Sequence, residues 1–262
     1  MNNYEKLEGM VAATFTPLDE NGDVNLSVID KYADWIASTP IKGVFVCGTT
    51  GEFSSLTIDE RKLILEKWLV SARKRFKVIA HVGSNCQRSA MELARHAAQV
   101  GADAIASIAP SFFKPGTVDE LVDFFAPICH SAAGLPFYYY NMPSITGVNL
   151  PVDKFLVEGK KKIPNLVGTK FTHNNLMEMG VCIELEQHRF EVLHGYDEIL
   201  ISGLAMGAVA GVGSTYNYIP NVYQAIFDSM KMNDLETARH NQIKSIRTVE
   251  VIIKYAGGVS GG

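Results

Sequence analysis

A single lysine, Lys170, lies near the end of the apolar run VGTKF at residues 167–171. Lysine is almost never fully buried unless its charge is paired. Alternate side chains of a strand share a face, so Gly168 would lie beside Lys170 and leave space for its stem. Burial lowers the pKa of an amine, and a neutral amine attacks a carbonyl carbon to form a Schiff base. The alternative is a lysine that ends a strand and extends outward into solvent.

Polar and ionisable residues also follow other apolar runs. Tyr140 ends the run PFYYYN, Thr49 and Thr50 lie in GTTGE, and Asp197 and Glu198 lie in HGYDE. The hydroxyls and backbone N–H groups of GTTGE are suited to hold a carboxylate at the start of a helix. Plainer alternatives remain for all three. GTTGE would also serve as a tight turn with a helix cap, the tyrosine as a core residue, and the acidic pair as the first turn of a helix.

The sequence around these residues shows a regular alternation of two kinds of segment. Short apolar runs are followed by longer segments with helical spacing, and Thr57–Glu60 and Thr117–Glu120 fit capping boxes that open helices. Near-continuous apolar runs are typical of parallel strands that are covered by helices. Eight such units predict a (β/α)8 TIM barrel, with its active site at the carboxyl ends of the strands. The runs begin at Met10, Gly43, Lys77, Asp103, Pro136, Asn165, Glu191 and Gly207.

The alternative fold is a doubly wound open sheet. Such a sheet would place a glycine-rich phosphate turn after the first strand, where this chain has TPLDENGD instead. No linker divides the sequence. We therefore expect a barrel over residues 1–233, followed by a short C-terminal helical extension over residues 234–262. The helical segment of that extension should run from Asp234 to Tyr255.

Composition excludes several functional classes. The 262 residues carry a net charge of −4, which argues against nucleic acid as a partner. No apolar leader and no membrane-spanning segment are present, so we expect a cytoplasmic protein. The four cysteines form no CxxC pair and the seven histidines form no HExxH, so we expect no bound metal. A flavin- or metal-dependent barrel would need phosphate-loop glycines or ligand clusters that the sequence lacks.

Taken together, the motifs resemble the pyruvate-dependent aldolase and lyase family that includes N-acetylneuraminate lyase and dihydrodipicolinate synthase. The resemblance covers Leu7 to about Ser260 and is specific because the motifs come in family order and at family spacing. It implies a (β/α)8 barrel that assembles as a homotetramer and needs no cofactor, since a lysine adduct supplies the electron sink. The motifs are GTTGE, YYYNMPSITG, GTKF, HGYDE and GSTYNY.

Within this family the sialic acid branch fits best. The synthase branch has an arginine in the turn after the tyrosine, where this chain has Ile145. The resemblance implies a class I lyase that cleaves N-acetylneuraminate reversibly to N-acetylmannosamine and pyruvate. Lys170 would form the imine, Tyr140 would relay protons, and Thr49 and Thr50 would hold the substrate carboxylate. The hydroxyls of the sugar would be bound by Thr172, Gly195, Asp197, Glu198 and Ser214.

Two departures from the family pattern are visible. Many relatives have a tyrosine that reaches a neighbouring subunit's site, where this chain has Phe112, and relatives continue beyond the position of Gly262. Two other functions stay open. One is a related aldolase that acts on another 2-keto acid, such as a 2-keto-3-deoxy sugar acid or the semialdehyde adduct of the synthase. The other is a catalytically silent protein of the same fold that binds sugar acids.

Overall fold

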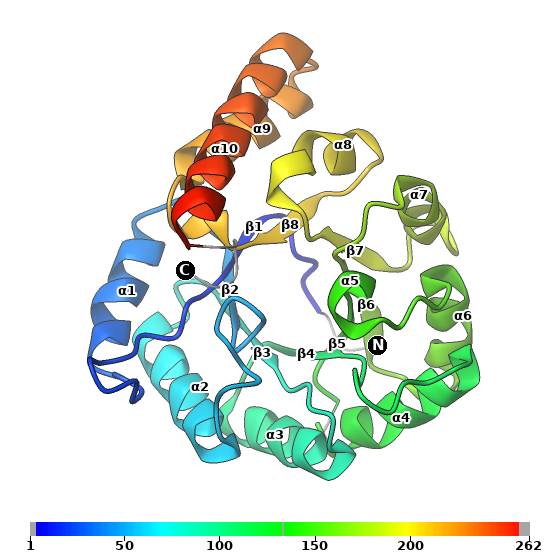
Figure 1. Ribbon diagram of the computed structural model, residues 1–262. Helices are drawn as coiled ribbons and strands as arrows, with labels where there is room; N and C mark the ends of the chain where they lie inside the picture. The colour runs from blue at the N-terminus through cyan, green and yellow to red at the C-terminus, as the bar shows by residue number, and fades with distance from the viewer. Residues whose placement is uncertain (1–3, 133, 257–262) are drawn as a thin grey trace. The chain divides into compact units, whose positions relative to one another are not determined.

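The strands of the molecule form a closed barrel in which β1 to β8 follow one another in sequence order. The computed structural model describes residues 4–132 and 134–256 (Figure 1). Each of the eight apolar runs contributes one strand, so the predicted (β/α)8 barrel is confirmed. The strands are β1 (Gly9–Ala13), β2 (Gly43–Val46), β3 (Lys77–His81), β4 (Ala104–Ile108), β5 (Phe137–Asn141), β6 (Leu166–Phe171), β7 (Glu191–His194) and β8 (Ala210–Gly213).

Helices follow the strands, as the alternation predicts. Both predicted capping boxes are present, at the starts of α2 and α4. The α-helices are α1 (Val28–Ala37), α2 (Ile58–Ala72), α3 (Gln87–Val100), α4 (Val118–Ser131), α5 (Pro143–Thr146), α6 (Val152–Lys162), α7 (Leu176–Glu184), α8 (Leu200–Ala205), α9 (Pro220–Lys231) and α10 (Leu235–Ala256). Among the described residues, short 3-10 helices are formed by η1 (Asp197–Ile199) and η2 (Thr215–Asn217).

The chain divides into two compact units, each described here by itself. The first unit comprises the N-terminal segment to Leu7 and residues 79–193. In this unit β4, β5 and β6 pair in parallel, and α3, α4, α6 and α7 lie outside them (Figure 1). The register places Ile108, Tyr140 and Lys170 side by side on three neighbouring strands. Side chains from distant parts of the sequence therefore meet at one level.

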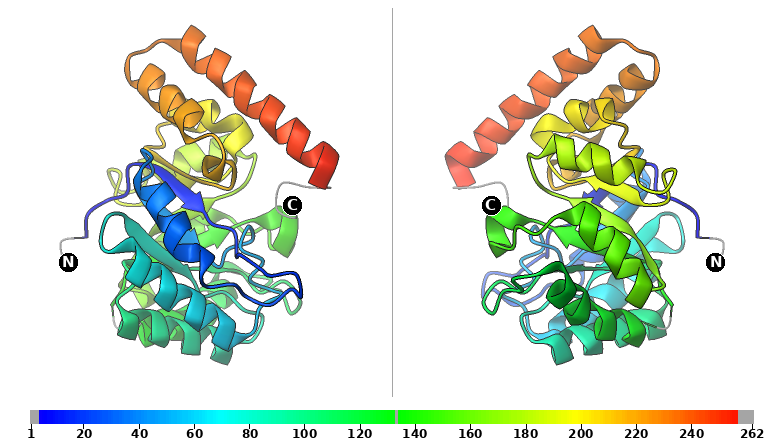
Figure 2. Two further views of the ribbon diagram at one scale, coloured as in Figure 1. Left: turned by 90° about the vertical axis from the view of Figure 1, so that its left-hand side faces the viewer. Right: turned by 90° about the vertical axis from the view of Figure 1, so that its right-hand side faces the viewer.

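The second unit comprises residues 8–78 and the chain from His194 onward. In this unit β1 pairs with both β2 and β8. Helices α9 and α10 lie side by side, as both views of Figure 2 show. The helix expected from Asp234 to Tyr255 is observed as α10. The boundary at residue 233 stays a prediction, and residues 257–262 of the expected extension lie outside the described residues.

A buried histidine, His194, ends β7 and belongs to the second unit. His194 is 1% exposed, and neither ring nitrogen has a hydrogen-bond partner among the described residues. Gly203 of α8 packs against the ring so closely that an added Cβ would lie 2.5 Å from its Cγ. Burial disfavours the charged imidazolium and lowers the pKa of His194 to about 4. The folded protein therefore keeps this side chain neutral.

We expect His194→Phe to reduce the loss of stability in acid. The pKa of His194 rises from about 4 to its ordinary 6.5 on unfolding, so the unfolded chain binds the proton more tightly. The contribution of the neutral His194 to the free energy of unfolding is therefore at its maximum above pH 6.5. It falls as the pH drops toward 4, by about 3 kcal/mol in total. Urea unfolding midpoints at pH 7 and pH 4.5 should differ less for His194→Phe than for the wild type. The exposed His240 of α10 gives the control His240→Gln, which should behave as wild type. Equal acid losses in His194→Phe and wild type would contradict this account.

Candidate active site

The structure brings Lys170 and Tyr140 together in the first unit. Lys170 lies on β6 and is only 4% exposed, and Tyr140 lies opposite it on β5 and is 2% exposed. The Nζ of Lys170 lies 4.1 Å from the centroid of the Tyr140 ring. An ammonium on the face of an aromatic ring is attracted by the ring quadrupole, whereas burial favours the neutral amine. An amine and a phenol are thus in contact at the carboxyl ends of two adjacent strands.

The side chain of Tyr140 also interacts with two residues that the sequence analysis did not select. Its hydroxyl donates a hydrogen bond to the Sδ of Met142 at 3.1 Å. The imidazole of His81 lies edge-on to the ring, with 5.9 Å between centroids and planes at 84°. The signal that could have found His81 is its place within the apolar run KVIAHVGS, since a buried histidine needs a polar partner.

The space beside Gly168 is occupied by the backbone of β7, which differs from the expectation. An added Cβ on Gly168 would collide with the backbone carbonyl oxygen of Glu191 on β7. The glycine therefore allows close approach of the neighbouring strand, and it does not provide room for the stem of Lys170. This corrects the physical reason given for the glycine, while the burial of the lysine is as expected.

Thr172 has an unsatisfied polar group beside this pair. The residue follows β6, is 3% exposed, and its backbone N–H donates to the carbonyl of Asn141 at 2.9 Å. Its Oγ1 has no hydrogen-bond partner among the described residues. A buried hydroxyl without a partner costs roughly 1–3 kcal/mol. A ligand oxygen would remove that cost, so Thr172 is suited to bind a hydroxyl or carboxylate.

In the second unit, Asp197 is held firmly at the start of η1. It is 4% exposed, and its Oδ2 accepts hydrogen bonds from the backbone N–H of Thr215 at 2.8 Å and from its Oγ1 at 2.6 Å. Gln242 of α10 donates to the backbone carbonyl of Asp197 at 3.0 Å. An added Cβ on Gly213 would collide with the carboxylate. The glycine that ends β8 thus allows the carboxylate of Asp197 to lie against this strand.

The remaining predicted residues of the β7 and β8 ends are half-buried. Gly195 lies between β7 and η1, and Glu198 lies on η1 directly after Asp197. Ser214 follows β8, and its carbonyl accepts a hydrogen bond from the Nδ2 of Asn217 at 2.7 Å. These residues share the second unit with Asp197. Glu198 offers a carboxylate, Ser214 offers a hydroxyl, and Gly195 offers backbone groups that no side chain covers. Such groups are suited to hydrogen-bond a polyol.

The loop 47–53 after β2, which contains GTTGE, forms a tight turn in the second unit. The backbone N–H of Gly51 donates to the carbonyl of Gly48 at 3.1 Å. Thr50 is buried and Thr49 is half-buried. A carboxylate would have to be held by the hydroxyls and amides of this turn.

The expectation that GTTGE lies at the start of a helix is wrong. Helix α2 begins only at Ile58, after the N-cap residue Thr57. The Thr57 Oγ1 accepts from the backbone N–H of Glu60 at 3.2 Å, and the Glu60 carboxylate accepts from the backbone N–H of Thr57 at 2.7 Å. The capping box therefore satisfies the helix end locally, and GTTGE is not part of the first turn of α2.

A buried arginine lies close to this turn and was also missed. Arg61 of α2 is 4% exposed, and its guanidinium lies 5.4 Å from the centroid of the Phe53 ring. Burial lowers the pKa of Arg61 to about 10 and raises the pKa of the neighbouring Cys47 thiol to about 11. The arginine links α2 to both ends of loop 47–53. Only a long-range contact places it there, so local sequence gave no signal.

Phe112, at the position where the resemblance implies a tyrosine in many relatives, lies in the first unit after β4. It is 76% exposed and its ring packs edge-on against Phe113 at 4.9 Å. Its backbone N–H donates to the Oδ1 of Asn85 at 3.3 Å. The phenyl ring has no hydroxyl to donate, so proton transfer from this position is excluded.

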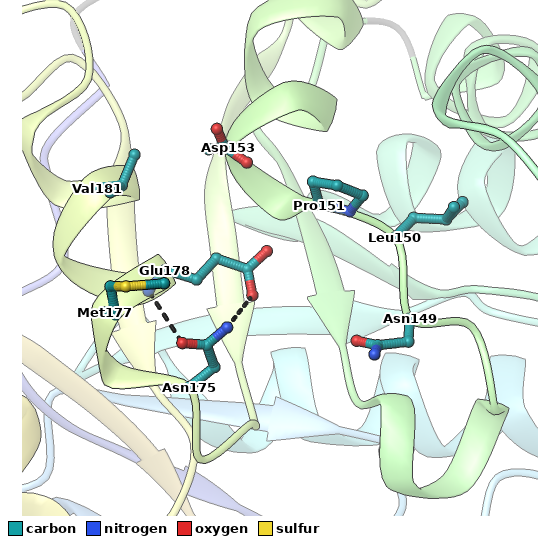
Figure 3. Close-up of a pocket in the computed structure, with 8 residues that line it drawn as sticks. All are labelled: Asn149, Leu150, Pro151, Asp153, Asn175, Met177, Glu178 and Val181. Atoms are coloured by element: carbon teal, nitrogen blue, oxygen red, sulfur yellow. Dashed lines mark hydrogen bonds between the residues drawn. The ribbon is translucent and has the colours of Figure 1, made fainter.

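A pocket of about 350 Å³ in the first unit contains none of the predicted site residues (Figure 3). Two of its polar side chains, Asn175 and Glu178, are already hydrogen-bonded to each other. Glu178 accepts from the backbone N–H of Val152 at 2.6 Å, and Asn175 accepts from the backbone N–H of Glu178 at 3.2 Å. These bonds tie the start of α6 to the start of α7. The lining residues are Asn149, Leu150, Pro151, Asp153, Asn175, Met177, Glu178 and Val181.

Within residues 4–132 and 134–256, no group of three or more histidine, cysteine, aspartate or glutamate residues is arranged to hold a metal ion. Over the same residues, no helix is long and apolar enough to cross a membrane.

Comparisons with known proteins agree on one family. A profile of the dihydrodipicolinate synthetase family matches residues 6–259. N-acetylneuraminate lyase of Mus musculus is 42% identical over 259 residues, which cover 98% of this chain and 81% of the mouse protein. The solved structure of N-acetylneuraminate lyase from Proteus mirabilis superposes with a TM-score of 0.94 at 34% identity, covering 98% of this chain and 91% of that chain.

A third relative bears on the lysine. A structure described as a catalytic lysine mutant of the sialic acid aldolase from Ruminococcus gnavus has a TM-score of 0.91 at 27% identity. The match covers 98% of this chain and 83% of that chain. The similar proteins thus include enzymes named for one sugar acid, and one of them is described as having a catalytic lysine.

Proposed function

Because the chain belongs to the dihydrodipicolinate synthetase family, we propose that it is a Schiff-base lyase that cleaves N-acetylneuraminate reversibly to N-acetylmannosamine and pyruvate. The observation that carries the chemistry is the buried Lys170 with its Nζ 4.1 Å from the centroid of the Tyr140 ring. The choice of sugar acid rests on the similarity to N-acetylneuraminate lyases along nearly the whole chain. The homotetramer and the cytoplasmic location implied by the resemblance are kept as parts of this proposal.

Lys170 acts as the nucleophile. Its neutral amine attacks the C2 ketone of the open-chain sugar acid, and loss of water gives a protonated imine. The C4 hydroxyl then loses its proton, the C3–C4 bond breaks, and its electron pair moves into the imine to give an enamine. The aldehyde formed at C4 leaves as N-acetylmannosamine. Protonation of the enamine at C3 and hydrolysis of the imine release pyruvate and restore the amine, so no cofactor is needed.

Tyr140 moves the protons of this sequence. A positioned acid or base typically contributes about 10²–10⁴-fold to such steps. In the structure the phenol donates to the thioether of Met142, and a thioether is only a weak acceptor. A substrate oxygen would therefore replace this partner at little cost. The phenol then exchanges protons with the carbinolamine oxygen and with the C4 hydroxyl.

The remaining predicted residues bind the substrate. Thr49 and Thr50 hold the carboxylate with their hydroxyls and backbone amides. The unsatisfied Oγ1 of Thr172 and the fixed carboxylate of Asp197 support their roles toward the oxygens of the sugar. The residues proposed to bind the polyol are Thr172, Gly195, Asp197, Glu198 and Ser214.

A substrate panel tests the proposed function. We expect pyruvate release from N-acetylneuraminate, weaker release from a 2-keto-3-deoxy sugar acid, and no condensation of pyruvate with aspartate semialdehyde. The reason is that Ile145, which is 59% exposed on α5, offers no charge to the second carboxylate that the synthase adduct carries. Pyruvate is measured by coupled reduction, and the condensation product by chromatography.

The other outcomes identify the alternatives. Faster release from the 2-keto-3-deoxy sugar acid would make the chain an aldolase for that class of substrate. Binding of N-acetylneuraminate without pyruvate release, measured by calorimetry on the same sample, would make it a silent sugar-acid binding protein.

A further inference from the structure

His81 packs edge-on against the ring of Tyr140 and has no role in the scheme above. It ends β3 in the first unit and is 3% exposed. The register pairs His81 with Ala106 on β4 and pairs Ala106 with Tyr138 on β5. Paired residues of neighbouring strands face the same side, and the small side chain of Ala106 leaves space between His81 and β5. The imidazole extends across this space to the ring of Tyr140, edge-on at 5.9 Å.

The imidazole is fixed by a hydrogen bond to the intervening strand. The backbone N–H of Ile108 donates to the Nε2 of His81 at 3.3 Å. Because Nε2 accepts, the neutral ring carries its proton on Nδ1. Delivering a proton from Nε2 would require breaking this bond. The geometry therefore favours a role in holding Tyr140 over a role as an acid.

The local sequence after β3 preserves the position of this ring. An added Cβ on Gly83 would lie 2.6 Å from the Nε2 of His81 and 3.0 Å from the Cγ2 of Ile108. Any residue larger than glycine would therefore displace the imidazole or the strand that binds it. Glycine at this position leaves the contact between His81 and Tyr140 undisturbed.

We propose that His81 is a positioning residue that holds the ring of Tyr140 against the amine of Lys170. The ring of Tyr140 has Lys170 over its face and His81 at right angles to it. The hydroxyl must serve two substrate oxygens in turn, so small changes in ring orientation affect the proton transfers. A misplacement of about 1 Å costs on the order of 10²-fold in rate. The inference rests on the proposed function of Lys170 and Tyr140, and it assigns His81 to the proton-transfer steps alone.

Two substitutions of His81 test the effect of its ring and the effect of its hydrogen bond separately. His81→Gln keeps an acceptor near the position of Nε2 but removes the ring, and His81→Phe keeps the ring but removes the acceptor. We expect kcat to fall about 10- to 100-fold in His81→Gln and to recover most of that loss in His81→Phe. The yield of borohydride trapping with pyruvate should stay near wild type in both. A merely structural role would lower trapping and the thermal midpoint together with kcat.

A double-variant cycle gives the decisive measurement. If His81 acts through the hydroxyl of Tyr140, His81→Gln should cause little further loss of kcat in a Tyr140→Phe background. An equal loss in both backgrounds, or a His81→Gln enzyme as active as the wild type, would overturn the inference.

A second measurement, hydrogen exchange on pyruvate, tests the role of His81 without using the sugar acid as substrate. Exchange of the methyl hydrogens of pyruvate in D₂O needs only the imine and a proton relay, and we expect the same pattern among the variants. Wild-type exchange without N-acetylneuraminate cleavage would refute the proposed substrate, and the exchange rates would still decide the role of His81. Wild-type cleavage with unchanged rates in His81→Gln would refute the inference alone. A wild type that neither cleaves nor exchanges would refute both.

Discussion

Lys170→Met will lose turnover by roughly 10⁴- to 10⁶-fold, the scale observed when a covalent nucleophile is removed. Methionine has a similar length and no amine, so the imine and its electron sink cannot form. Borohydride treatment with pyruvate should modify the wild type on the peptide that contains Lys170 and leave Lys170→Met unmodified. Intact mass and peptide mapping measure the adduct. Because the side chain is 4% exposed, an apolar replacement of similar length removes a buried polar group and should not lower the thermal midpoint much.

Lys154 provides the matched control for this experiment. It lies in the same unit on α6, and its side chain is 70% exposed. Lys154→Met should keep wild-type turnover and trapping, because this exposed side chain pairs with Asp153 and is not one of the proposed site residues. An adduct on another lysine, or turnover that survives in Lys170→Met, would show that the nucleophile has been assigned wrongly.

The arrangement of strands could be read from the sequence because it depends on local patterns. Apolar runs and capping boxes report the periodicity of the chain and the hydrogen bonds at helix ends. Lys170 and Tyr140 were recognised as ends of two successive strands on this basis. That they lie opposite each other follows from the β5–β6 register, which has an irregularity between Phe137 and Tyr138. Local periodicity does not determine such a shift.

Apart from the Met142 sulfur, which lies only two residues from Tyr140, the features that the sequence analysis missed are long-range contacts. His81 meets Tyr140 across β4, and the carboxylate of Asp197 lies against β8 beside Thr215. The same limitation explains the wrong reason given for Gly168, whose missing side chain makes room for the β7 backbone. A glycine in a strand reports that something approaches closely, but it does not say which element does so.

The surroundings of Tyr140 make the chemistry of its hydroxyl separable from the packing of its ring. The contacts with Lys170 and His81 both involve the ring, whereas the hydroxyl contacts the sulfur of Met142. Removal of the oxygen alone should therefore leave the lysine in place. A substitution that removes only the hydroxyl of Tyr140 therefore tests the proton relay without disturbing the nucleophile Lys170.

Tyr140→Phe is expected to lower kcat by about 10²–10⁴-fold and to leave trapping with pyruvate near the wild-type yield. The ring and its contact with Lys170 remain, so the amine still forms the imine over the long incubation of a trapping experiment. Proton transfer from the C4 hydroxyl loses its relay, and cleavage slows. KM should change little, since the phenol is assigned to the reacting protons and the carboxylate is assigned to other residues. Initial rates of pyruvate release and trapped mass, measured on the same samples, give both quantities.

Tyr139→Phe is the control, because Tyr139 is the next residue of β5 and faces the other side. It is 1% exposed and packs against Phe155 with 4.6 Å between ring centroids. Loss of its hydroxyl should leave kcat within a few-fold of wild type, whatever it does to the thermal midpoint. Similar losses of kcat in both variants would mean that hydroxyl removal harms the packing of β5 in general. Turnover near wild type in Tyr140→Phe would exclude the phenol as the relay, and the proton transfers would then have to be assigned to a substrate carboxylate or a water molecule.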